Sequence, residues 1–310
     1  MIITGTFLDE ISHDIPHQNW GEKEWEADFL AMKAVGIQTV ILIRCGYKRW
    51  TTYPSEILTA RENCYRPPVD LVDLFLRLSD RYEMDFYFGL YDSGKYWTSG
   101  RYMEEVDINR AVIDEVWQKY GHHRSWKGWY ISQEVSRRVG SIIDTYSLLG
   151  KHCKSVSGNL STLISPYIDG KKAIMSYESV LSKEDAVSLA QHEKEWDEIL
   201  SGLKNAVDIV AFQDGHVDFH ELTDYLKVNK ALADKHGLRS WTNAESFDRD
   251  MPIKFLPIKW EKLKLKLEAA EAAGVEKAIT FEFSHFMSPN SAYPQAHHLY
   301  NRYREWMAER

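Results

Sequence analysis

Cysteine is scarce in this sequence, and no stretch is both long and apolar. Three cysteines, Cys45, Cys64 and Cys153, occur in 310 residues. Their odd number and long spacings predict neither a disulfide framework nor a zinc site. No hydrophobic run approaches the roughly 18 residues of a membrane-spanning helix. Residues 1–5 already read as a strand and lack the regions of a signal peptide. A cytoplasmic protein and an exported one whose signal has been removed therefore both stay open.

Positive charge is also in short supply. The 38 Lys and Arg residues are outnumbered by 46 Asp and Glu residues, which gives a net charge of −8. This balance argues against a nucleic-acid partner, which would require a basic surface. No G-x-G-x-x-G turn follows the first predicted strand, and no Gly-rich phosphate cradle follows the last two. The adjacent histidines at 122–123 and 297–298 do not suit one metal, because neighbouring helical residues point apart. We therefore expect neither a cofactor nor a bound metal.

Aromatic residues, by contrast, are abundant, with 11 Trp and 17 Tyr in the chain. Such rings fill cores, but they also offer apolar faces on which the C–H surfaces of sugars can stack. Several lie in the loops after the second and third predicted strands: Tyr47, Trp50, Tyr53, Tyr91, Tyr96, Trp97 and Tyr102. Their positions favour a ligand-binding role for part of the set.

Eight short apolar segments alternate with eight amphipathic helices. The strands are predicted at residues 2–7, 39–43, 85–90, 129–131, 161–164, 208–212, 238–241 and 277–281. Strands that alternate with helices imply parallel pairing, and eight such units predict a closed (β/α)8 TIM barrel in the α/β class. No interval has the composition of a linker, so we expect residues 1–310 to form one domain. An open doubly wound sheet is the alternative, since the fifth strand is the weakest of the eight.

Acidic residues follow most of the predicted strands. In barrels the active site is built from the loops that follow the strands. A carboxylate at the end of a buried strand costs desolvation energy unless something uses it. The acids at these positions are Asp9, Glu10, Asp92, Glu134, Asp214, Glu245 and Glu282. They predict an acidic site at one end of the barrel.

Two carboxyl groups that flank a sugar are the requirement for glycosidic cleavage. One protonates the leaving oxygen, and the other attacks the sugar or activates water. Acids within a cup of aromatic rings therefore predict a carbohydrate ligand, either an oligosaccharide or a simpler glycoside. The expected substrate-binding residues are Gln133, Asp92, Tyr91, Trp97, Tyr167, Asp214, Trp241, Asn243, Glu282 and His285.

The layout resembles that of the large group of retaining glycoside hydrolases built on (β/α)8 barrels. The whole chain, with short motifs such as GWYISQE at 128–134, also resembles the family catalogued as domain of unknown function 4434, which is suspected of glycoside hydrolase activity. The resemblance implies that Glu134 is the general acid/base and Glu245 the nucleophile, with carboxyl groups about 5–5.5 Å apart. Gln133 stands where those hydrolases usually carry an Asn that binds the sugar 2-hydroxyl.

The two catalytic candidates also have structural interpretations. Glu134 can pair with Arg137 or Arg138, and Glu245 with Arg249. In either case the carboxylate would serve the fold rather than a substrate.

Glu282 is a competitor of Glu245, since it lies between two phenylalanines and a buried acid of this kind is often functional. It can instead anchor a hydrogen-bond network with Arg44 or Arg239.

Two other functions fit the same acids and aromatics. The first is a metal-dependent sugar isomerase or hydrolase, in which Glu134, Asp214, Glu245 and Glu282 surround a divalent ion. The second is a carbohydrate-binding barrel without activity, in which the carboxyl pair does not close on a common point.

Overall fold

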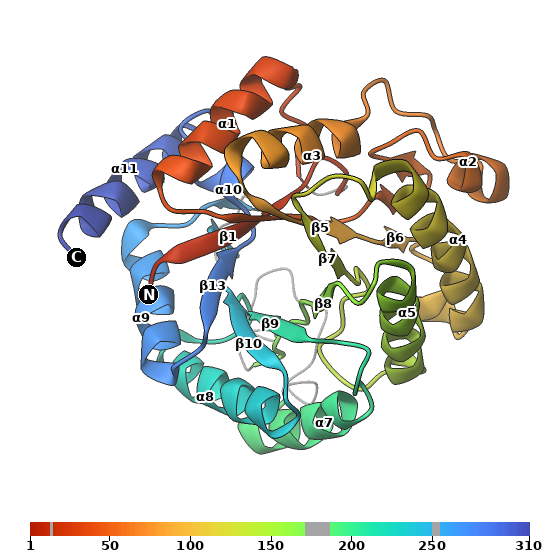
Figure 1. Cartoon of the computed structure of the whole chain (residues 1–310). Coiled ribbons are helices and arrows are strands. Elements are labelled where there is room, and N and C mark those ends of the chain that lie inside the picture. Colours follow the sequence, from red (N-terminus) through yellow and green to blue (C-terminus); the bar gives the residue numbers. More distant parts are fainter. Residues whose placement is uncertain (13–14, 171–186, 250–254) are drawn as a thin grey trace.

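The computed structural model describes residues 1–12, 15–170, 187–249 and 255–310 of the chain. Eight parallel strands close into a barrel in the order β1-β2-β5-β7-β8-β9-β10-β13, with β13 returning to β1. Figure 1 shows the helices outside this ring of strands. The predicted (β/α)8 barrel is confirmed, and the open sheet is excluded because β1 pairs with both β2 and β13.

Each barrel strand is followed by a helix. The strands are β1 (Ile3–Leu8), β2 (Thr39–Leu42), β5 (Asp85–Gly89), β7 (Trp126–Tyr130), β8 (Ser161–Ile164), β9 (Ile209–Gln213), β10 (Arg239–Asn243) and β13 (Lys277–Thr280). The outer helices are α1 (Glu22–Ala34), α3 (Leu71–Tyr82), α4 (Tyr102–Tyr120), α5 (Ile142–Val156), α7 (Leu189–Ser201), α8 (Phe219–Lys235), α9 (Trp260–Ala273) and α11 (Pro294–Ala308). The fifth strand, β8, has the predicted bounds. The fourth, β7, begins and ends earlier than expected, so Glu134 lies four residues beyond its end.

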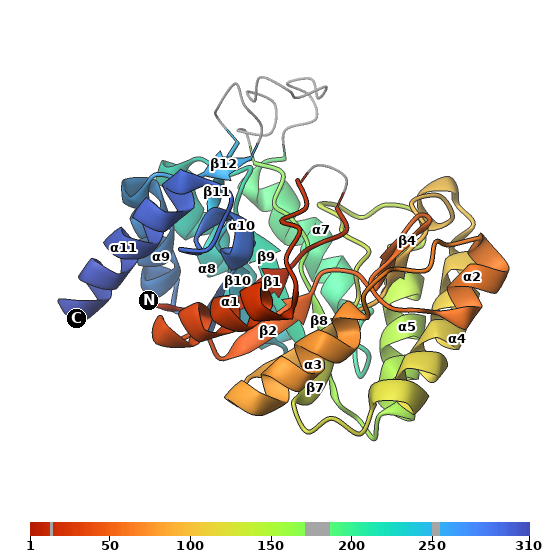
Figure 2. The ribbon, with the colours of Figure 1, turned by 90° about the horizontal axis from the view of Figure 1, so that it is seen from above.

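Smaller elements sit in the loops that follow the strands. They are β3 (Gly46–Tyr47), β4 (Trp50–Thr51), α2 (Glu56–Glu62), β6 (Tyr91–Asp92), the 3-10 turn η1 (Trp97–Ser99), β11 (Phe247–Asp248), β12 (Leu256–Pro257) and α10 (Phe283–Phe286). Figure 2 shows β11 and β12 together at the upper edge of the barrel and β4 apart from them, to the right. These additions build the walls of the functional face. The sequence predicted these regions only as loops without regular structure.

Large apolar side chains fill the barrel interior, as expected for a packed barrel rather than a pore. Phe7, Tyr87, Tyr130 and Trp241 belong to this inner cluster, and the rings of Tyr87 and Trp241 meet edge-on with centroids 6.0 Å apart. Close packing leaves no room for a Cβ at Gly128, which would lie 2.3 Å from the Tyr87 ring. Packing in the barrel interior therefore requires glycine at position 128.

The last helix closes the barrel against the first strand. The Tyr303 hydroxyl on α11 accepts a hydrogen bond from the Ile3 amide at 2.7 Å. Both termini lie beside α9 (Figure 1), where Met1 and Arg310 each bind the Glu271 carboxylate. Among the described helices, none has the length and apolar character needed to span a membrane.

Candidate active site

A cavity of about 240 Å³ opens at the carboxyl ends of the barrel strands. Its lining residues come from the carboxyl ends of seven of the eight strands and from the loops that follow them. They are Ser12, Ile15, Ile43, Arg44, Tyr47, Asp92, Glu134, Gln213, Glu245, Phe247, Arg249, Phe255 and Phe281. Three of the predicted site residues, Glu134, Glu245 and Asp92, are thus brought together in one cavity.

Glu134 reaches the cavity from the loop after β7. Its Oε1 accepts a hydrogen bond from the Tyr130 hydroxyl at 2.6 Å, and its Oε2 lies 3.7 Å from Nη2 of Arg44. Burial raises the pKa of Glu134, and the opposing effects of Arg44 and Tyr130 do not cancel the rise. A protonated carboxyl group is therefore favoured here over a wider pH range than in water.

Arg137 and Arg138 are not the partners of Glu134. Arg137 binds Glu195 at 2.7 Å, and Arg138 binds Glu198 at 2.6 Å. The simplest structural interpretation of Glu134 was wrong, and its carboxyl group faces the cavity instead.

Glu245 faces the same cavity from the loop after β10 and is only 1% exposed. Arg249 binds it with two parallel hydrogen bonds, from Nε to Oε2 at 2.8 Å and from Nη2 to Oε1 at 2.7 Å. Burial alone would raise the pKa of Glu245, but Arg249 and the nearby charge of Lys266 outweigh it and lower the pKa to about 2. Glu245 is therefore ionised across the ordinary pH range.

Gly215 is fitted closely beneath this ion pair. A Cβ at this position would lie 1.9 Å from Oε2 of Glu245 and 2.4 Å from Nε of Arg249. Both distances are shorter than any real contact, so only glycine lets the loop after β9 approach the pair. Gly215 thus makes room for Glu245 and Arg249.

Arg44 links two of the cavity acids. It follows β2, and its Nε lies 3.5 Å from Oδ2 of Asp92 while its Nη2 faces Glu134. Asp92 also accepts hydrogen bonds from Nε1 of Trp97 at 3.0 Å and from the Gly94 amide at 2.8 Å. Trp97, a predicted sugar-binding residue, therefore orients Asp92 at the edge of the site.

Asp214 holds the Glu245 loop from below. Its Oδ1 accepts hydrogen bonds from the Glu245 amide at 3.0 Å and from Nζ of Lys266 at 2.7 Å. Lys266 also donates to the Glu245 carbonyl at 3.0 Å, and the side chains of Asp214 and Lys266 are 1% and 5% exposed. Asp214 thus acts on the backbone of Glu245, and it is absent from the described cavity lining.

Lys266→Met is expected to lower the free energy of unfolding by about 3–5 kcal/mol, because it leaves the Asp214 carboxylate buried without its cation. Urea denaturation followed by circular dichroism measures the change. Lys264→Met is the matched control on the same helix, since Lys264 is exposed and pairs with Glu268 at 3.7 Å. The control is expected to stay within about 0.5 kcal/mol of the parent. Equal losses in the two variants would contradict the role given to Lys266.

Gln133 and Tyr91 point away from the cavity. The Gln133 amide nitrogen donates to the Tyr91 carbonyl at 3.0 Å and to Oε1 of Glu105 at 3.1 Å. Tyr91 is fully buried and donates its hydroxyl to the Lys48 carbonyl at 2.7 Å. Glu134 lines the cavity, whereas its neighbour Gln133 is buried and absent from the described lining.

Glu282 and His285 form a buried pair behind the site. The Glu282 carboxylate accepts a hydrogen bond from Nδ1 of His285 at 2.6 Å. It also accepts hydrogen bonds from the amides of Ser284 and His285 and so caps the start of the short helix α10. Burial would lower the pKa of His285, but the charge of Glu282 raises it to about 9. Arg44 and Arg239 do not reach Glu282, since Arg44 binds the cavity acids and Arg239 binds Glu276. Glu282 is absent from the described lining of the cavity.

The remaining predicted residues lie near the cavity or below it. Trp241 fills the barrel interior at the level of Lys277, whose Nζ lies 4.6 Å from its ring centroid. Asn243 is buried and donates to Oγ of Ser165 at 3.2 Å. Tyr167 is partly exposed, and burial, followed by the charge of Glu134, raises its pKa. Of these three, Tyr167 is electrostatically coupled to the candidate acid.

Ten of the thirteen lining residues were not among the predicted site residues, and four of these ten are Arg44, Gln213, Arg249 and Phe281. Arg44 directly follows the second strand and Phe281 ends the predicted eighth, so a rule that includes every strand end would have found both. Gln213 is the last residue of β9, immediately before Asp214. Arg249 was considered as a partner of Glu245, and that pairing is confirmed.

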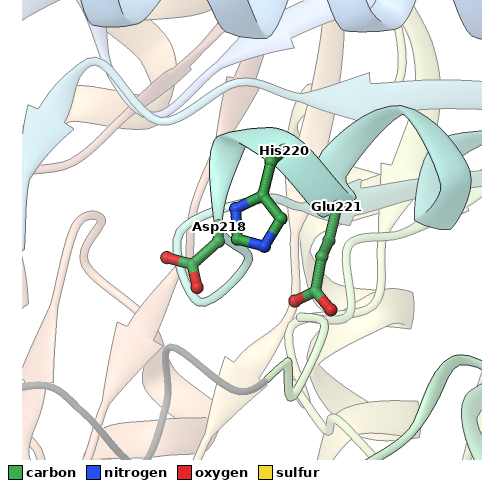
Figure 3. Close-up of side chains that lie close together, drawn as sticks. All are labelled: Asp218, His220 and Glu221. Atoms are coloured by element: carbon green, nitrogen blue, oxygen red, sulfur yellow. The ribbon is translucent and has the colours of Figure 1, made fainter.

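Three of the four acids proposed for a metal site are already engaged by other groups. Glu245 binds Arg249, Asp214 binds Lys266, and Glu282 binds His285. Among the described residues, the one group with metal-like spacing is Asp218, His220 and Glu221 at the start of α8, whose ligand atoms lie within 4.8 Å of one another (Figure 3). None of the three lines the cavity, so a metal there would not act on its contents.

The structure is a (β/α)8 barrel with a small acid-lined cavity at the carboxyl ends of its strands. The chain belongs to the family described as domain of unknown function DUF4434, whose model matches residues 3–293. A protein from Bacteroides thetaiotaomicron VPI-5482, provisionally described as an alpha-L-fucosidase, is 61% identical in sequence with a TM-score of 0.95. The match covers 100% of this chain and 96% of that one. No curated protein has a sequence that matches this chain.

More distant structures share the fold. The endo-1,4-beta-D-mannanase of Thermotoga petrophila RKU-1 is 11% identical with a TM-score of 0.59, covering 98% of this chain and 99% of its own. The intracellular xylanase of Thermoanaerobacterium saccharolyticum JW/SL-YS485 is 12% identical with a TM-score of 0.54, covering 89% and 84%. At these identities the likeness concerns the fold alone.

Proposed function

We propose that this protein is a retaining glycoside hydrolase in which Glu134 is the general acid/base and Glu245 the nucleophile. One observation carries the proposal: two carboxyl groups line one cavity, and their surroundings shift their pKa values in opposite directions. Such a divergence separates a proton donor from a permanent anion and is the usual way in which one site supplies both. The 61% identical relative, provisionally described as an alpha-L-fucosidase, supports the same class.

The two residues divide the reaction between them. A Glu245 oxygen attacks the anomeric carbon while Glu134 gives its proton to the glycosidic oxygen, so that the glycosidic bond breaks and a glycosyl ester forms. Glu134, now ionised, removes a proton from water, and the resulting hydroxide displaces Glu245 from the sugar. Each carboxylate oxygen has two lone pairs, so Arg249 can hold Glu245 without occupying all of them.

An α-L-fucoside is the first substrate to test, because the 61% identical relative is provisionally described as an alpha-L-fucosidase. The cavity volume of about 240 Å³ lies below the range of drug-sized sites, about 300–1,000 Å³, and suits a single sugar ring. Phe247 and Phe281 give it an apolar wall, and Asp92 and Gln213 offer hydrogen bonds to hydroxyl groups.

Time-resolved proton NMR of hydrolysis tests the proposal directly. A panel of glycosides led by α-L-fucosides is incubated with the enzyme, and the anomer released first is recorded before mutarotation. The account predicts release of the same anomer as in the substrate. Release of the opposite anomer would contradict the retaining mechanism, and binding without turnover would identify a non-catalytic carbohydrate-binding barrel.

Arg44→Gln is expected to shift the alkaline limb of the kcat/KM–pH profile to higher pH. The acid must be protonated, so activity falls as the pH rises through the pKa of Glu134. The positive charge of Arg44 lowers that pKa, and its removal therefore raises it. Arg239→Gln is the control, since Arg239 pairs with the exposed Glu276 outside the cavity. An alkaline limb that moves to lower pH would contradict the assignment of Glu134.

A further inference from the structure

A second, larger cleft adjoins the candidate active site. Its volume is about 900 Å³, against about 240 Å³ for the cavity. Ser12, Ile15 and Tyr47 line both spaces, so the cleft is continuous with the cavity. We call it the aromatic groove, lined by Trp20, Trp25, Tyr47, Trp50 and Tyr65 together with Glu10, Lys48, Arg66 and Val69.

Exposed apolar side chains gather in this groove. Trp50, Tyr65 and Val69 are 60%, 47% and 49% exposed, which places them among the few large hydrophobic residues that the described surface leaves open. The Trp50 and Tyr65 rings lie 5.0 Å apart at 49°. Exposed aromatic surface beside a site usually marks a binding region, because burial of these rings would otherwise be favourable.

The groove wall is rigidly constructed. Trp50 pairs with Tyr47 in the antiparallel β3–β4 ribbon, and the Tyr65 amide donates to the Arg49 carbonyl at 2.7 Å. The Arg49 guanidinium lies over the Tyr65 ring, 4.4 Å from its centroid. The aromatic rings are therefore held in place before any ligand arrives, which reduces the entropy lost on binding.

A mostly buried carboxylate also lines the groove. The Glu10 side chain is only 8% exposed, yet it lines the groove. Its Oε1 makes no hydrogen bond to any of the described residues. Its nearest charged neighbours are Nε2 of His285, 3.9 Å from Oε1, and Nδ1 of His17, 3.5 Å from Oε2. A sugar hydroxyl in the groove would give this carboxylate the hydrogen bond that it lacks.

We propose that the aromatic groove binds the leaving group of the substrate, and that this leaving group is a saccharide. The inference rests on the proposed glycosidase function. One sugar ring occupies the cavity, the scissile bond lies near Tyr47, and the next ring stacks on Trp50 while Glu10 accepts a hydroxyl hydrogen bond. The enzyme thus removes a terminal sugar from an oligosaccharide rather than from a small aglycone.

The experiment compares two substrates that share a glycon. 2′-Fucosyllactose carries a disaccharide leaving group, whereas α-L-fucosyl fluoride releases only fluoride and leaves the groove empty. Trp50→Ala is expected to lower kcat/KM on 2′-fucosyllactose up to about tenfold, the effect of one lost stacking contact. The same variant is expected to leave the fluoride unchanged. Trp50→Phe should restore part of the loss, and Glu10→Ala, which removes the acceptor, should repeat the selective loss.

Leu265→Ala is the matched control, because Leu265 is 48% exposed on α9 and does not line the groove. Equal losses of Trp50→Ala on both substrates, or none on either, would overturn the inference. Failure of the proposed function would appear differently, as a wild-type protein that hydrolyses neither substrate. In that case calorimetric binding to an oligosaccharide panel decides: a weaker Kd in Trp50→Ala supports the groove, and no binding by the wild type refutes it.

Discussion

Glu245→Gln is expected to lower kcat/KM for a glycoside by at least about 10⁴-fold, because the amide cannot form the glycosyl ester through which the reaction passes. The variant also leaves Arg249 without its counter-ion, so a loss of stability must be distinguished from a loss of catalysis. Urea denaturation of the variant supplies that separation. Glu276→Gln is the control, since Glu276 is an exposed carboxylate paired with Arg239.

Chemical rescue distinguishes a nucleophile from a structural carboxylate. In Glu245→Ala, azide can occupy the vacated space and attack the anomeric carbon of a glycosyl fluoride in place of the side chain. The expected product is a glycosyl azide of inverted configuration. A variant that keeps near-parent hydrolysis, or one that no added nucleophile rescues although it is folded, would remove Glu245 from the reaction.

Glu134→Ala is expected to lower kcat/KM by about 10²–10⁴-fold on substrates whose leaving group needs a proton. The first step on a glycosyl fluoride is expected to change little, because fluoride leaves without protonation. Azide should then accelerate release of the sugar and give a glycosyl azide of retained configuration, since the Glu245 ester is the species attacked.

The comparison between substrates makes the assignment of Glu134 specific. A folding defect would lower kcat/KM, which reports the first step, for the fluoride and for the oligosaccharide alike, and a thermal-melting control would reveal it. Similar losses on both substrates in a stable variant would show that Glu134 positions the sugar rather than protonates the leaving oxygen.

The barrel could be predicted because its signals are local. Alternating apolar strands and amphipathic helices determine the parallel topology, and even the weak strand at 161–164 was found with its observed bounds. The additions on the functional face were not predicted as elements, because β3, β4, β6, β11 and β12 have two residues each. Segments that short carry no periodic pattern, and tertiary contacts decide their pairing.

The position of a site residue along the chain was easier to predict than the direction of its side chain. Counting strands brought Glu134 and Glu245 to one cavity. The same count also suggested Gln133, Glu282 and Trp241. In the structure, Gln133 donates a hydrogen bond to Glu105, Glu282 binds His285, and Trp241 packs in the barrel interior. Which way a side chain faces depends on where its strand ends, and β7 ends at Tyr130, one residue before the predicted bound.

Covalent trapping tests the central assignment most directly. The 2-deoxy-2-fluoro glycosyl fluoride of the released sugar slows hydrolysis of the ester, so a carboxylate oxygen that attacks the anomeric carbon and expels fluoride stays glycosylated. Peptide mass spectrometry then locates the sugar. The account predicts a label on Glu245 in the wild type and none in Glu245→Gln. A label on Glu282 or another acid, or turnover of the reagent with no label at all, would contradict it.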